Sequence, residues 1–267
     1  MLRAILSSLC AVLLLAACTD IGPRQPGDHV RSLMTGTIAE RNAFITHALT
    51  DESDRVHQIN MQNRSLEIGL QYLANHLNID AQVDWDALER QGISREHATT
   101  TLNLYDATYA DGLRAILWQL RPRSGSIGYA VEGGRLVIRP MPAFAFPETA
   151  AQRKVNDAVK AKLGEILEAP ASLLQARPFD GQFYVLGFAA KMSIIVDWDE
   201  LTRAGVKRDA PVVANPASAK AGAYVMVLVN QLAMDGPAVR YDIRHGMVRV
   251  STQARLDAEH ALEQRLP

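Results

Sequence analysis

Apolar residues recur along this chain at helical and strand spacings, in an order of elements that occurs twice. The first copy predicts a strand over 56–61, a helix over 66–77, a short strand ending at 83, a short helix ending at 88, a strand over 99–104, a helix over 109–120 and a hairpin over 127–138. The second copy predicts a helix over 183–190, a strand over 194–196, a short helix over 197–202, a helix over 224–232 and a hairpin that turns at 245–246. The order predicts an α+β fold of two tandem small α/β modules, each running strand, helix, strand, helix and hairpin.

A short signature marks both copies. Val83-Asp84-Trp85-Asp86-Ala87-Leu88 returns as Val196-Asp197-Trp198-Asp199-Glu200-Leu201, 113 positions later (196 − 83). We expect Asp84 and Asp197 to cap the short helices, and Trp85 and Trp198 to pack the modules. Gly92 and Gly205 should end these helices. A catalytic pair of carboxylates is the alternative, but residues i and i+2 do not share a face at a strand-to-helix junction.

The two copies differ at one strand. The first copy has a run rich in β-branched residues over 99–104, whereas its counterpart, Val212-Val213, is flanked by Pro211 and Pro216. Proline cannot donate to a strand ladder, so the second strand should be short, at an edge or absent. An exposed strand edge can recruit a partner by main-chain pairing. We therefore predict a partner-docking edge formed by Thr99, Thr101, Leu102 and Leu104.

The first 18 residues are typical of a secretory signal. Arg3 is followed by an apolar run over 5–15, too short to span a bilayer, which needs about 20 residues. Leu15-Ala16-Ala17-Cys18 resembles the lipobox of bacterial lipoproteins, which implies that Cys18 becomes the acylated first residue. Thr19 follows it in place of an aspartate, and in the sorting rule of such lipoproteins this implies an anchor in the outer membrane, on its periplasmic face.

Composition and charge narrow the possible functions. Cys10 leaves with the signal and Cys18 is lipidated, so the mature chain has no thiol for a disulfide, a zinc site or a nucleophile. A net charge of −1 argues against a nucleic-acid partner. The seven histidines include no i, i+4 pair, and no phosphate-binding glycine loop occurs. We predict no catalytic residue, no metal site and no cofactor.

These observations divide the chain into six segments. They are a signal peptide over 1–17, a tether and lead-in helix over 18–50, a first module over 51–142, a linker helix over 143–169, a second module over 170–252 and a C-terminal helix and tail over 253–267.

The order of elements resembles the secretin and TonB short N-terminal domain, a small α/β module of bacterial envelope proteins. The resemblance covers about 56–140 and 170–252, and in the first copy it rests on Leu70, Leu73, Val83 to Leu88, Gly92, Leu113, Leu117, Tyr129, Gly134, Leu136 and Ile138. Members of that family are interaction modules that pack into rings or dock on envelope partners, and they are not enzymes. The resemblance thus implies secretin, pilus or secretion components as partners, with a possible homo-oligomer. Nothing in the chain resembles a secretin pore domain.

Three classes of function follow. The first is a non-enzymatic assembly subunit of an envelope machine. The second is a lipoprotein that binds cell-wall glycan, with Trp118 or Tyr105 stacking on sugar unless both aromatic rings belong to the core. The third is a hydrolase whose site one sequence does not reveal.

Overall fold

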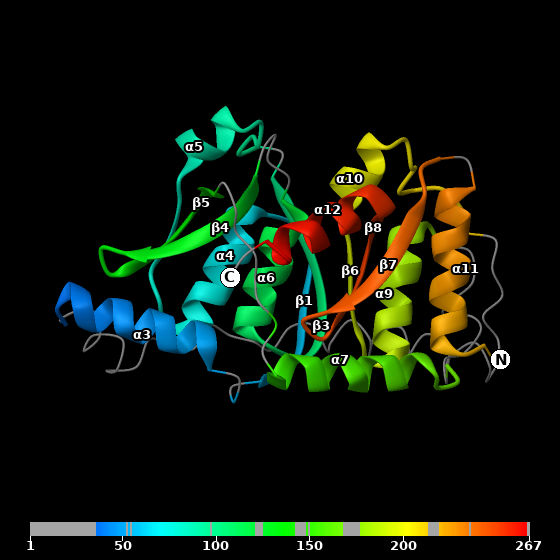
Figure 1. Ribbon diagram of the computed structural model, residues 1–267, viewed down its shortest axis with the longest axis horizontal. Helices are drawn as coiled ribbons and strands as arrows, with labels where there is room; N and C mark the ends of the chain where they lie inside the picture. The colour runs from blue at the N-terminus through cyan, green and yellow to red at the C-terminus, as the bar shows by residue number, and fades with distance from the viewer. Residues whose placement is uncertain are drawn as a thin grey trace, which may run out of the picture.

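The computed structural model describes residues 36–51, 53, 55–96, 98–120, 125–141, 148, 150–167, 177–212, 219–234 and 236–265. The predicted signal peptide, Cys18 and most of the tether lie outside these residues. The chain mixes helices with strands in small sheets, consistent with the α+β class. The described residues of 51–142 (module one) lie on the left of Figure 1, and those of 170–252 (module two) lie on the right.

Module one combines a two-stranded ribbon with a three-stranded sheet. A lead-in helix α3 (Ile38–Thr50) precedes β1 (Arg55–Ser65), α4 (Leu66–Leu77), β2 (Ala81–Val83), α5 (Trp85–Arg90), β3 (Thr99–Thr108), α6 (Tyr109–Gln119), β4 (Ser126–Glu132) and β5 (Arg135–Met141). Strands β1 and β3 pair antiparallel, and the sheet has the order β2-β5-β4 with β2 parallel to β5. The β4–β5 turn uses Gly133 and Gly134, both with positive φ, as a two-residue hairpin requires.

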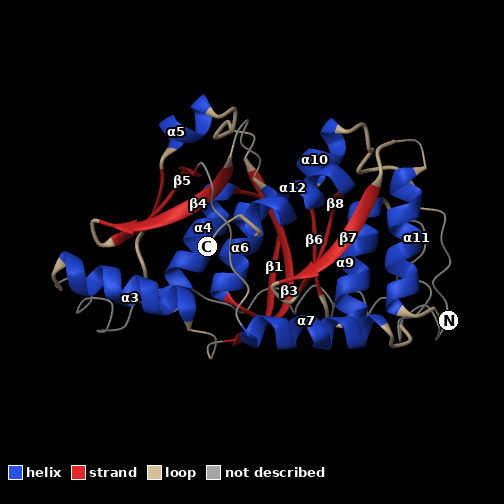
Figure 2. Cartoon of the chain, in the orientation of Figure 1, coloured by secondary structure: helices blue, strands red, loops and turns tan. Residues whose placement is uncertain are grey.

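Module two repeats the three-stranded sheet and its helices. It comprises α9 (Phe179–Ala190), β6 (Ser193–Val196), α10 (Trp198–Arg203), α11 (Ala221–Ala233), β7 (Val239–Arg244) and β8 (Met247–Thr252), preceded by α7 (Ala150–Leu163) and followed by α12 (Gln253–Glu263). The sheet order β6-β8-β7, with β6 parallel to β8, matches β2-β5-β4 (Figure 2). Helix α12 starts directly after β8 because Thr252 Oγ1 accepts a hydrogen bond from the Arg255 amide at 3.2 Å.

The ends of the two-stranded ribbon also recur in the second half of the chain, with one residue, Ile166, in the segment just before module two. Isolated antiparallel bridges pair Ile166 with Lys220 and Pro178 with Pro211, whereas the ends of the β1–β3 ladder pair Arg55 with Thr108 and Ser65 with Thr99. Each of the four bridge residues lies 111 to 113 positions after its counterpart in the β1–β3 ladder (166 − 55 = 111 and 178 − 65 = 113). Residues 168–176 and 213–218, between the bridges, lie outside the described residues, and so does Val213 of the predicted short strand.

Each lead-in helix docks on the hairpin turn of its own module through an asparagine. The Gly134 amide donates to Asn42 Oδ1 of α3 at 2.9 Å, and the Gly246 amide donates to Asn156 Oδ1 of α7 at 2.7 Å. A Cβ atom on Gly246 would lie 2.7 Å from Val155 Cγ1, so this close approach requires glycine. The repeated unit therefore includes the helix that precedes each module.

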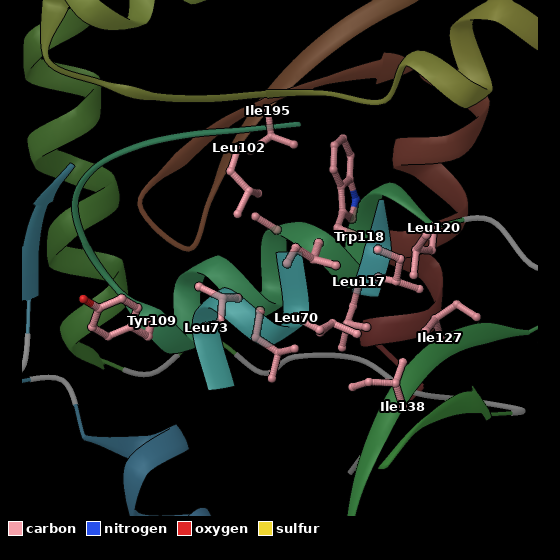
Figure 3. Packing of buried hydrophobic residues seen from close by; sticks show 14 of the residues in the cluster. Leu70, Leu73, Leu102, Tyr109, Leu117, Trp118, Leu120, Ile127, Ile138 and Ile195 are labelled. Atoms are coloured by element: carbon pink, nitrogen blue, oxygen red, sulfur yellow. The ribbon is translucent and has the colours of Figure 1, made fainter. Parts of the chain in front are cut away.

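The two modules share a core. One buried cluster gathers the apolar residues of module one and also contains Ile195, Met247 and Leu256 from β6, β8 and α12. In Figure 3, Ile195 lies beside Leu102 of β3 and near Trp118 of α6. A second cluster fills module two between its sheet and helices α9 and α11.

The expectation of an exposed edge at β3 is wrong. Leu102 and Leu104 are fully buried, and β3 lies between β1 and module two. The Tyr105 amide donates to Ser193 Oγ of β6 at 2.9 Å, and the Thr101 amide donates to Gln119 Oε1 at 3.1 Å. Thr99 pairs with Ser65 of β1. A run rich in β-branched residues predicts a strand whether the free edge of that strand faces solvent or a second module, which explains the error.

Candidate functional site

The signature aspartates lie at the starts of the short helices. Asp84 Oδ1 accepts from the Ala87 amide at 3.0 Å, and Asp197 Oδ1 accepts from the Glu200 amide at 3.1 Å. These bonds satisfy amide groups that the first helical turn leaves unpaired. Gly92 and Gly205 follow the helices with φ of 84° and 92°, a conformation that favours glycine. The geometry at both signatures is that of a capped turn between strand and helix.

Each signature tryptophan lies in a small charged cluster that the sequence patterns did not reveal. Trp85 Nε1 donates to Glu67 Oε1 at 2.9 Å, and Arg95 lies 5.7 Å from the Trp85 ring centroid while pairing with the same carboxylate at 2.7 Å. Module two places Arg208 5.5 Å from the Trp198 ring and 3.2 Å from Asp180. All three positions keep the 113-residue offset, with Glu67 replaced by another acidic residue, Asp180 (95 + 113 = 208, 67 + 113 = 180, 85 + 113 = 198). Applying that offset to charged positions would have found both clusters.

A buried charged cluster joins the two modules. Arg249 of β8, with a side chain 2% exposed, donates to Asp242 through Nε at 2.8 Å and Nη2 at 2.6 Å, and to Glu259 of α12 through Nη1 at 2.9 Å. Glu259 also accepts from Trp118 Nε1 of α6 at 2.7 Å, and the Arg249 guanidinium lies 5.1 Å from the Trp118 ring. His260 Nε2 lies 3.2 Å from Asp242 Oδ2.

The cluster keeps Arg249 charged. Burial alone would lower the pKa of Arg249, but the hydrogen bond with Asp242 and the negative charge of Glu259 outweigh burial and raise it. Buried charges of this kind are tolerated when paired and hydrogen-bonded. Four side chains, Asp242, Arg249, Glu259 and Trp118, thereby connect β7, β8, α12 and α6.

We call the buried contact between the two modules, around Arg249, Glu259 and Trp118, the joint. A cavity of about 20 Å³ lies in this joint. It is lined by Arg114, Ala115, Trp118, Ile195, His245, Met247, Arg249 and Glu259. Burial, reinforced by the positive charge of Arg249, lowers the pKa of His245 to about 2, so this imidazole is neutral at physiological pH. The cavity has room for about one water molecule and is far smaller than the roughly 300 Å³ or more of an organic ligand site.

The sequence offered two aromatic residues for stacking on sugar, and both are buried. Trp118 is 7% exposed and belongs to the joint. Tyr105 is 8% exposed, and its hydroxyl accepts from Gln58 Nε2 at 3.0 Å. Neither ring presents a face to solvent for a glycan.

Two further features concern metals and membranes. Within the described ranges, no group of three or more His, Cys, Asp or Glu side chains is arranged to hold a metal ion. Across the same part of the chain, no helix has the length and apolar character needed to cross a membrane. The predicted lipidation site, Cys18, lies outside these ranges.

Comparison with known proteins adds no family. No family model, no curated protein and no solved structure matches this chain.

Proposed function

We propose that the chain is a non-enzymatic lipoprotein of the outer membrane that acts as an interaction or assembly subunit of an envelope machine, such as a secretin, a pilus or a secretion system. The observation that carries the proposal is the repeated module itself. Each copy has a three-stranded sheet with one parallel and one antiparallel pairing, two longer helices and a capped short helix after the first sheet strand.

This arrangement supports the resemblance to the secretin and TonB short N-terminal domain. The ribbon of β1 and β3 beside the sheet β2-β5-β4 has the element order that the resemblance implies, and the bridges at Ile166 and Pro178 extend it to module two. Modules of that family act by binding other envelope proteins. The buried joint supports the same role, because it packs both modules together, so that a partner would meet them as one unit.

The lipid anchor can be tested separately from the interaction. We expect the full chain to incorporate labelled palmitate and to fractionate with outer membranes, and Cys18→Ser to do neither. Equal labelling of the Cys18→Ser variant would refute the anchor.

The assembly role is tested by cross-linking in intact cells that carry the native chain. Purification of the cross-linked wild type should enrich secretin, pilus or secretion components over a control lipoprotein that has the same signal peptide fused to an unrelated domain. Equal recovery with both proteins would refute the assembly role, whatever the outcome for the anchor.

A further inference from the structure

Helix α11 exposes a stripe without charge at the outer end of module two. Ala223, Met226, Val227 and Asn230 are exposed at i, i+3, i+4 and i+7, with Met226 at 38% and Val227 at 39%. The 13 residues of this helix include no Asp, Glu, Lys or Arg. Surface helices ordinarily carry charged residues on their outer face, and exposed apolar residues grouped in one place mark interaction surfaces.

The equivalent stripe of α6 is already docked. Subtracting 112, the offset that aligns the two helices, gives Asp111, Arg114, Ala115 and Trp118 (223 − 112 = 111 and 230 − 112 = 118). Three of these four residues line the cavity in the joint, where Ala115 is 1% exposed. Helix α6 therefore packs with this stripe against the sheet of module two.

The surface that receives α6 has a partly exposed counterpart in module one. Ile195, Met247 and Arg249 share one face of the β6–β8 pair, and all three are buried by module one and α12. Their equivalents in the sheet of module one are Gln82, Arg135 and Val137 (195 − 113 = 82, 247 − 112 = 135 and 249 − 112 = 137). Gln82 and Arg135 are exposed and Val137 is half-buried. In Figure 1, helix α12 crosses the sheet of module two, whereas β4 and β5 have no helix in front of them.

This partly exposed face is suited to an uncharged helix. The register pairs Gly128 with Arg139, Ala130 with Val137 and Glu132 with Arg135 on this face. Gly128 is buried, Ala130, Val137 and Arg139 are half-buried, and Glu132 and Arg135 are exposed, so small and partly covered residues form its centre. Its charged side chains already have partners, because Arg139 pairs with Glu132 at 3.1 Å and Arg135 with Asp80 at 3.3 Å. A helix without charge can cover this centre and leave no ion unpaired.

We propose that a second copy of this chain occupies these surfaces, with α11 of one copy docked on the outer face of the β2-β5-β4 sheet of the next. The contact repeats between chains the joint that already exists within each chain. The stripe and the sheet face lie at opposite ends of the long axis, so they belong to different contacts of one molecule (Figure 1). Such a head-to-tail contact generates a ring if its rotation closes and a filament if it does not. The inference rests on the proposed assembly role and specifies one of its partners.

Thiol cross-linking tests the geometry of the contact. Val227→Cys and Val137→Cys replace residues equivalent to Ala115 and Arg249, which line the same cavity in the joint. The two variants of the full chain are purified in detergent, mixed and treated with a short bifunctional thiol reagent, with wild type as the control for Cys10 and Cys18. We expect the mixture to give a cross-linked dimer well above the wild-type background and above either variant alone. A dimer from Val227→Cys alone would show a two-fold contact and would overturn the proposal.

Sedimentation of the purified full chain tests the energetics. Wild type should associate in a concentration-dependent manner, and Met226→Glu should weaken association by about tenfold or more, since each tenfold corresponds to about 1.4 kcal/mol. Met234→Glu is the matched control, because Met234 is 76% exposed at the end of the same helix and outside the stripe. A wild type that stays monomeric up to its solubility limit, or equal effects of the two substitutions, would overturn the proposal. Since only purified chain is used, that result leaves the cross-linking test for other envelope partners intact.

Discussion

Replacing Arg249 by methionine should destabilise the protein through the joint between its modules. The substitution keeps a long apolar side chain and removes three hydrogen bonds, two with Asp242 and one with Glu259. Both carboxylates are poorly hydrated, with side chains 15% and 17% exposed, and they would remain without their cation.

The magnitude follows from the burial of these groups. Removing one partner of a buried ion pair costs about 3–5 kcal/mol, because the remaining charge is uncompensated. The Trp118 indole still donates to Glu259, and His260 still lies near Asp242, so we expect the lower end, about 3 kcal/mol. Adding Asp242→Asn and Glu259→Gln to Arg249→Met should restore much of the loss, because it removes the unpaired charges.

Urea unfolding followed by circular dichroism at neutral pH measures the loss. Arg139→Met is the matched control, since Arg139 forms an exposed pair with Glu132 whose side chains are 38% and 49% exposed. An exposed pair contributes about 0–1 kcal/mol. If Arg249→Met and Arg139→Met lost the same free energy of unfolding, the buried cluster would not hold the joint as described.

Two further predictions concern His245 and the signature tryptophans. His245 has a pKa lowered to about 2 in the folded state against an ordinary 6.5, so its contribution to stability is complete above pH 6.5 and is lost as pH falls toward 2. Between pH 7.5 and 5 this loss of unfolding free energy is about 2 kcal/mol. The variant His245→Asn should not show the loss, and asparagine suits the positive φ at this position. Urea midpoints that fall equally with pH in the wild type and in His245→Asn would contradict the assignment. Trp198→Ala should lower the free energy of unfolding by about 3–5 kcal/mol because the ring is 7% exposed, whereas Trp85→Ala should cost clearly less because Trp85 is only half-buried. Equal losses in urea titrations followed by circular dichroism would show that burial of the ring is not what stabilises each module.

The sequence was sufficient for features that depend on neighbouring residues. The helix over 66–77, the hairpin over 127–138 and the aspartate before each short helix all follow from local chemistry, and each lies where it was expected. Helix α12 starts at Gln253, directly after its Thr252 cap, within the C-terminal segment 253–267 for which a helix and tail were predicted.

Contacts between distant segments could not be predicted in the same way. The spacing of β3 indicates a strand but not that Ser193, 88 residues from Tyr105, binds its edge. Asn42 and Asn156 look like ordinary surface residues of their helices until the hairpin glycines are placed against them. The repeat offset was the one non-local signal in the sequence, and applying it to charged positions would have paired the arginines beside the tryptophans. It would not have paired the two asparagines, which lie 114 positions apart (156 − 42).

The repeat separates the positions that fold the module from those that decide what it binds. Inward-facing positions keep their character between the copies, as with Leu73 and Leu186 in the first helices and Ile138 and Val250 in the sheets. The outer face of the sheet changes completely, since Val137 corresponds to Arg249. The inner set packs each module, so the outer face can differ between the copies according to what it contacts, as Arg249 does in the joint. In module two the outer face holds a neighbour within the same chain, and the equivalent face of module one is consequently where this chain is best suited to hold another.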